Sequence, residues 1–153
     1  MHPTAADRAG DGLAQLAHAG VGVWLDGPSR DTLRSDALAG LVRDHRVVGV
    51  AITPESFARG VVGSPAYAAD LARLTRTGAG PEEILLALVG DDVRTACDAL
   101  RGVHEGTGGR DGWVAAPLDP RLARDEDATL LLARELQALV DRPNLAVAIP
   151  ATV

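Results

Sequence analysis

Short apolar runs alternate along this chain with longer segments in which apolar residues recur at helical spacing. The short runs are rich in β-branched residues and are too short for independent helices, which is typical of buried strands. We therefore predict four strands. They are expected at Val21–Leu25, Val47–Ile52, Gly112–Leu118 and Leu145–Ile149.

The longer segments predict helices, bounded by capping residues and by glycine or proline. Residues 1–12 are expected to be a flexible amino terminus, and Pro54 is expected to open a short helical turn. One helix is predicted to pause near Gly90 and to resume at Asp92. The other predicted helices are Leu13–Ala19, Arg30–His45 with Ser29 as its N-cap, Ser64–Leu74, a helix from Pro81 to Val103 with that pause, and Asp125–Val140.

Strands that alternate with helices indicate an α/β architecture in which parallel strands are covered by helices. We expect residues 1–153 to form a single domain. Four strands make half of a (β/α)8 barrel, whose usual size is about 250 residues. From periodicity alone, a half barrel and an open four-stranded α/β sandwich are equally good interpretations.

Composition limits the partners and the compartment. The net charge of -6 disfavours nucleic acid and anionic membranes as partners, because both would repel the average surface. The single Cys97 cannot form an internal disulfide, and the first twenty residues lack the apolar core of an export signal. We therefore expect a cytoplasmic protein. All 15 basic residues are arginines, so the chain contains no lysine.

A series of short strings sharpens the fold prediction. In their order and spacing they resemble the amino-terminal half of bacterial transaldolases, and this resemblance covers nearly the whole chain from about Leu13. It implies a partial (β/α)8 TIM barrel, a half barrel of about four parallel strands with covering helices. The strings are Val21–Asp26 with Ser29 and Arg30, Val47–Val50 with Pro54 and Phe57, Thr107–Val114, Pro120–Ala123, Arg142–Leu145 and Ile149–Thr152.

The resemblance also implies a reaction and a set of site residues. Transaldolases of the pentose phosphate type move a dihydroxyacetone unit between sugar phosphates through a Schiff base on a lysine of the fourth strand. The position of that lysine is Ala148 here, and the position of a proton-relaying glutamate on the third strand is Pro117. Thr53 replaces a substrate-orienting asparagine. Only Asp26 keeps the family residue.

We therefore expect a transaldolase-like protein that is catalytically inactive by itself. Alanine cannot form an imine, and only the α-amino group of Met1 could replace the lysine amine. The alternative is an active transferase that is completed by a second chain. The family's phosphate-binding residues lie in its second half and are absent here. We expect no cofactor and no metal, although a sugar-phosphate ligand is compatible with the resemblance.

Each candidate residue also has a structural interpretation. Asp26 is expected mainly to cap the loop Gly27–Ser29, and a paired-carboxylate cation site of Asp26 with Glu55 is a less favoured alternative. We expect Cys97 to pack on a helix flank. Trp24 is expected in the core or at the barrel rim.

A half barrel would have two unpaired strand edges and an exposed apolar concave face, both of which favour association. We expect either a homo-oligomer or a complex with a separate chain that supplies the second half. The remaining alternative is the remnant of a disrupted reading frame. One sequence does not separate these three.

Overall fold

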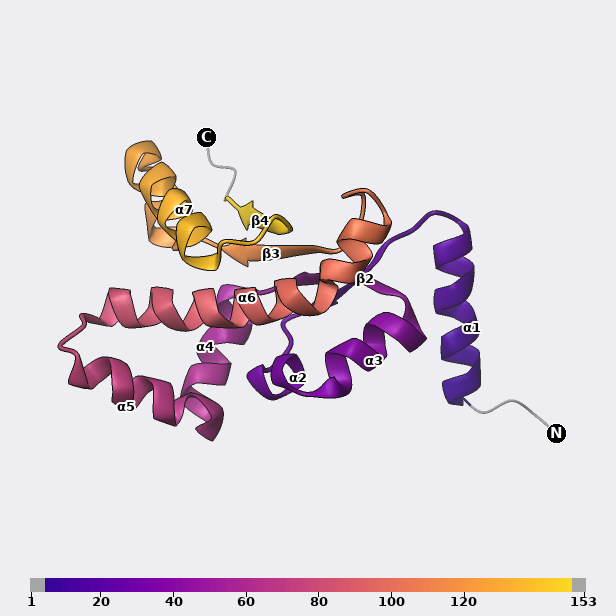
Figure 1. Ribbon diagram of the computed structural model, residues 1–153, viewed down its shortest axis with the longest axis horizontal. Helices are drawn as coiled ribbons and strands as arrows, with labels where there is room; N and C mark the ends of the chain where they lie inside the picture. Colours follow the sequence, from indigo (N-terminus) through magenta and orange to yellow (C-terminus); the bar gives the residue numbers. More distant parts are fainter. Residues whose placement is uncertain (1–4, 150–153) are drawn as a thin grey trace.

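A computed structural model describes residues 5–149 of the chain. The four strands form a single sheet, and the helices pack against it (Figure 1). The strands are β1 (Val23–Asp26), β2 (Val47–Ala51), β3 (Trp113–Pro117) and β4 (Leu145–Ala148). The helices are α1 (Ala5–His18), α2 (Arg30–Arg34), α3 (Asp36–His45), α4 (Pro54–Gly63), η1 (Pro65–Tyr67), α5 (Ala68–Arg76), α6 (Pro81–Gly106), η2 (Pro120–Leu122) and α7 (Glu126–Val140).

The sheet confirms the four predicted strands and their parallel pairing. The strand order is β1-β2-β3-β4, so each strand pairs with its neighbour in sequence. The register places Asp26 beside Ala51, Ala51 beside Ala115, and Pro117 beside Ala148. A doubly wound sandwich would need a reversal of strand order and helices on both faces. The consecutive order is that of a partial α/β barrel.

One face of the sheet carries the hydrophobic core. Successive strand residues point to opposite faces, and in β3 Val114 and Ala116 are fully buried while their neighbours are only half-buried. The core residues of β3 pack with Leu38 of α3, Val93 of α6 and Val140 of α7. The opposite, concave face therefore holds the alternate residues of each strand.

The segment predicted as one helix from Arg30 to His45 is two helices. Ser35 separates them, because its extended backbone ends α2 while its side chain accepts a hydrogen bond from the Ala37 N–H at 3.3 Å. A serine in this position is a good N-cap, and the cap outweighs continuation of the first helix. Arg46 in the left-handed region then ends α3.

The predicted pause near Gly90 is wrong, because α6 continues unbroken through it. A Cβ at Gly90 would lie 2.5 Å from Cδ2 of Leu139 in α7, so the glycine lets the two helices approach closely. The glycine thus serves the packing of α6 on α7.

The leading helix begins at Ala5, earlier than the predicted Leu13, and therefore includes residues 5–12 of the segment expected to be flexible. Residues 1–4 lie outside the described part. The turn expected after Pro54 is the full helix α4. No helix among residues 5–149 is both long and apolar enough to cross a membrane.

A buried charge cluster fixes the helices on the outer side of the sheet. Arg30 is 1% exposed and donates hydrogen bonds to Asp92 at 2.6 Å, to Asp70 at 2.8 Å and to the Leu88 carbonyl at 3.2 Å. The hydroxyl of Tyr67 donates to the other oxygen of Asp92 at 2.6 Å. The guanidinium also lies 3.8 Å from the centre of the Tyr67 ring. This cluster joins α2, η1, α5 and α6.

Candidate functional site

The four positions singled out by the sequence lie at the carboxyl edge of the sheet. Asp26, Pro117 and Ala148 are the last residues of β1, β3 and β4, and Thr53 follows the end of β2. The carboxyl edge of a parallel sheet is where α/β barrels place their active sites. The topology therefore brings the predicted positions to one rim.

The alternation of side chains places the strand positions on the concave face. Ala116 and Leu118 are buried in the core, so Pro117 between them points to the opposite side. Ala148 follows Val147, which packs on the core, and is itself exposed. These positions have the orientation that a barrel lumen requires.

Asp26 is exposed, and its carboxylate makes no hydrogen bond or ion pair with any residue in the described part of the chain. The expected capping of the loop Gly27–Ser29 is therefore absent. Ser29 caps α2 instead, because its hydroxyl accepts a hydrogen bond from the Thr32 N–H at 3.1 Å. The carboxylate remains available on the open face.

Thr53 has a structural role. Its hydroxyl oxygen accepts a hydrogen bond from the Ser56 N–H at 3.3 Å, and the Ser56 hydroxyl oxygen accepts one from the Thr53 N–H at 3.2 Å. These reciprocal bonds form a capping box at the start of α4. Gly27 lies against this cap, since a Cβ there would be 2.7 Å from Cβ of Ser56. The Thr53 hydroxyl is thus engaged in holding a helix end.

Pro117 and Ala148 add only apolar surface to the rim. Neither side chain can accept a proton, donate one or attack a carbonyl. Glu55, the other carboxylate considered, lies in the first turn of α4, where the helix dipole favours it. Among the described residues, no group of three or more His, Cys, Asp or Glu side chains could hold a metal ion.

Cys97 and Trp24 have clear structural positions. Cys97 is fully buried in the core, and burial raises the pKa of its thiol to about 12, so it is a poor nucleophile. Trp24 is 45% exposed and lies on the concave face over Gly49, where a Cβ would come within 2.4 Å of the indole. It lies on the open face, as the barrel-rim alternative expected.

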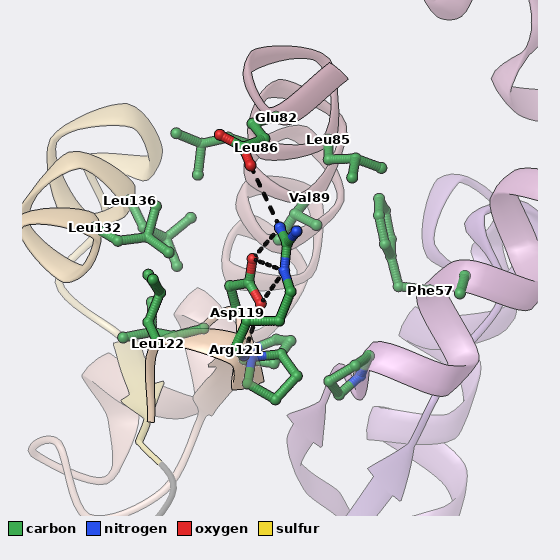
Figure 2. A pocket seen from close by; sticks show the side chains of 15 residues that line it. Phe57, Glu82, Leu85, Leu86, Val89, Asp119, Arg121, Leu122, Leu132 and Leu136 are labelled. Atoms are coloured by element: carbon green, nitrogen blue, oxygen red, sulfur yellow. Dashed lines mark hydrogen bonds and ion pairs between the residues drawn. The ribbon is translucent and has the colours of Figure 1, made fainter. Parts of the chain in front are cut away.

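A cavity of about 600 Å³ lies behind the rim, between α4, α6, η2 and α7. Figure 2 shows Phe57 of α4 on one side and Leu132 and Leu136 of α7 on the other, with α6 behind them. Arg121 extends across the cavity toward Glu82 of α6. Sequence reasoning missed this cavity. The signal available was the run Ile84–Val89, which is more apolar than one buried helix face requires.

The four consecutive parallel strands and their covering helices define part of an α/β barrel, with the predicted site positions at its carboxyl edge. A family model described as Transaldolase/Fructose-6-phosphate aldolase matches residues 23–153. The chain belongs to this family.

Three relatives show the same extent of likeness. The chain is 49% identical over 143 residues to the transaldolase of Acidothermus cellulolyticus, which covers 94% of this chain and 38% of that protein. It is 48% identical over 144 residues to the transaldolase of Thermobifida fusca, covering 94% and 39% of the two chains. For transaldolase 1 of Streptomyces coelicolor the identity is 46% over 140 residues, covering 92% and 37%. The chain thus spans well under half the length of these relatives.

Proposed function

We propose that this chain is a non-catalytic member of the transaldolase family. It keeps the strands and helices that present the site and lacks the groups that perform the reaction. The observation that carries this proposal is Ala148, which places a methyl group on the concave face at the end of β4. The resemblance puts the lysine nucleophile at that position.

The missing amine removes the covalent step. A Schiff base forms when a primary amine attacks the ketose carbonyl and water leaves, so the step needs an unprotonated amine in the lumen. Because the 153 residues contain no lysine, no side chain offers one. Pro117 removes the proton relay as well, and such relays contribute about 10²- to 10⁴-fold in rate.

Restoring the amine tests this proposal. In the Ala148→Lys variant, incubation with fructose 6-phosphate and borohydride should produce a covalent adduct, because borohydride reduces an imine to a stable secondary amine. The position is exposed, so most of the introduced amine is protonated at neutral pH. The rate of adduct formation should therefore rise from about pH 7 to about pH 9, as more of the amine loses its proton.

A lysine placed elsewhere provides the control. Leu131 is 60% exposed on α7, outside the rim, so Leu131→Lys measures adventitious modification of any exposed amine. We expect Ala148→Lys to exceed this control in both rate and extent, with the modified peptide containing position 148. Equal modification of the two variants would show that the rim does not present a transaldolase lumen.

A second candidate function is transfer of a dihydroxyacetone unit after completion by another half barrel. The observation that favours it is the pair of outer edges of β1 and β4, neither of which pairs with a strand among residues 5–149. Exposed apolar side chains flank these edges, with Val21 near β1 and Ile149 after β4. A second copy or a separate chain would cover them and enclose Asp26, but only a separate chain could supply the missing amine, because two copies of this chain contain no lysine.

Light scattering coupled to size exclusion tests association of the 153-residue chain. We expect a discrete species of twice the 15.8 kDa mass of one chain if two copies close the barrel. A discrete dimer should lose its association in the Ile149→Arg variant, which places a charge beside the β4 edge. A monodisperse monomer would contradict closure by a second copy and would leave a separate chain as the partner.

A further inference from the structure

The cavity between α4, α6, η2 and α7 has the size and lining of a small-molecule site. Its volume of about 600 Å³ lies within the range of about 300–1,000 Å³ that is usual for ligand pockets. Most of its wall is apolar, from residues such as Phe57, Leu86 and Leu132. Leu136 in its wall is 1% exposed and belongs to the hydrophobic core, so the cavity borders the core.

Three charged side chains line the mouth, and they are unequally paired. Arg121 donates to both oxygens of Asp119, with distances from 2.5 to 3.0 Å. The same guanidinium reaches Glu82 only at 3.4 Å, and the Glu82 side chain is 85% exposed. Two carboxylates thus face one guanidinium, and Glu82 keeps most of its hydrogen-bonding capacity (Figure 2).

The charged side chains at the mouth determine whether an anionic, neutral or cationic ligand fits the cavity. Hydrogen bonding from Arg121 lowers the pKa of Asp119, so this carboxylate is ionised at neutral pH. An anionic head group would find the only cation among the lining residues already occupied by Asp119, and it would be repelled by Glu82. A neutral sugar would leave the apolar wall in contact with hydroxyl groups. A cationic group can instead pair with Glu82 at the mouth.

We propose that this cavity binds a small amphipathic cation, an ammonium group carried on an apolar body. The body lies between Phe57 and Leu132, and the ammonium group contacts the Glu82 carboxylate. The lining residues lie mainly on the helix side of the sheet, although Pro117 at the rim also lines the cavity. Absence of binding here would leave the proposal of a non-catalytic transaldolase member unchanged, because that proposal rests on Ala148, which does not line the cavity.

An NMR titration of the 153-residue chain with 4-phenylbutylammonium tests the site. We expect saturable shifts of the amide signals of Leu86, Leu122 and Leu132, which come from three different elements of the wall. The anion 4-phenylbutyrate has the same body and should bind about two- to thirtyfold more weakly, since it loses the exposed ion pair with Glu82 and is repelled by that carboxylate. Equal affinity for the two probes would overturn the proposal.

Two pairs of variants locate the binding. Ala58→Trp fills the cavity from α4 and should abolish the saturable shifts, whereas Val62→Trp on the same helix, at a position that is 90% exposed, should leave them unchanged. Glu82→Gln should remove the preference for the ammonium probe. Glu105→Gln removes the same charge at the far end of α6 and should retain it.

Each variant is titrated from its own dispersed spectrum, so a folding defect is seen directly. Loss of binding in Val62→Trp equal to that in Ala58→Trp would contradict the assigned location. A titration of the folded parent chain without saturable shifts would overturn the site itself. A parent spectrum without dispersed amides would contradict the structure and the proposal together.

Discussion

Arg30 is buried almost completely, yet it forms ion pairs or hydrogen bonds with more residues than any other arginine in the described part of the chain. Its guanidinium neutralises Asp92, which is 3% exposed, and extends to Asp70 at the edge of the cluster. Burial raises the pKa of Asp92, while Arg30 and the Tyr67 hydroxyl favour its ionised form. The carboxylate therefore depends on these two partners.

Replacing Arg30 should be costly. Arg30→Met leaves Asp92 buried without its counter-ion, and breaking a buried pair from one side costs about 3–5 kcal/mol. Tyr67→Phe removes one hydrogen bond and should cost about 1–3 kcal/mol. Urea unfolding followed by circular dichroism measures both changes. Arg43→Met, at a side chain that is 72% exposed, should change the free energy of unfolding by less than about 0.5 kcal/mol.

An unfolding free energy of Arg30→Met equal to that of Arg43→Met would refute the role of the cluster. The sequence analysis included Arg30 in one of the strings that resemble transaldolases, but it did not predict the burial of this side chain. A charged residue in an amphipathic helix is assigned to the solvent face by default. Its partner Asp92 is 62 residues away, so only the tertiary fold brings the two together.

At the scale of elements, the strands were predictable and the helix boundaries were less so. Each strand is a compact apolar run, and burial on the helix side makes that signal strong. The break at Ser35 had a local signal, since Ser35 followed by Asp36 is typical of an N-cap. The continuity at Gly90 had none, because it depends on the close approach of Leu139 from α7.

The turn from α6 into β3 depends on one glycine. Gly112 has a φ of 81°, and a Cβ there would lie 2.4 Å from the backbone nitrogen of His104. The Gly112 carbonyl also accepts a hydrogen bond from Asn144 at 2.9 Å, which helps to place β4 beside β3. Neither contact can move without displacing a strand.

Two alanine substitutions distinguish the backbone strain of a positive φ from the steric clash of a new Cβ with its neighbours. Gly108 also has a positive φ, 63°, but nothing lies within 4 Å of its Cβ direction. Gly108→Ala should therefore cost about 1–2 kcal/mol. Gly112→Ala adds the backbone collision and should cost about 3–5 kcal/mol in all. Thermal unfolding of the two variants checks this difference, and equal losses would show that the turn is not constrained by His104.

At the scale of the whole molecule, parallel topology made the rim predictable. Asp26, Pro117 and Ala148 end their strands, and consecutive parallel strands bring such ends to one edge. The role of Thr53 as a helix cap was not predicted, because the resemblance directed attention to substrate contact. The cavity was missed since α4, α6, η2, α7 and the end of β3 must come together to form it.

The central claim is that this family member keeps the transaldolase frame without its nucleophile. The most direct measurement is the intact mass of the unmodified chain after incubation with fructose 6-phosphate and borohydride, with the transaldolase of Thermobifida fusca as the positive control. We predict an adduct on the control and no change in mass of this chain. A stoichiometric adduct on the unmodified chain would contradict the claim, because an amine within its 153 residues would then act as the nucleophile.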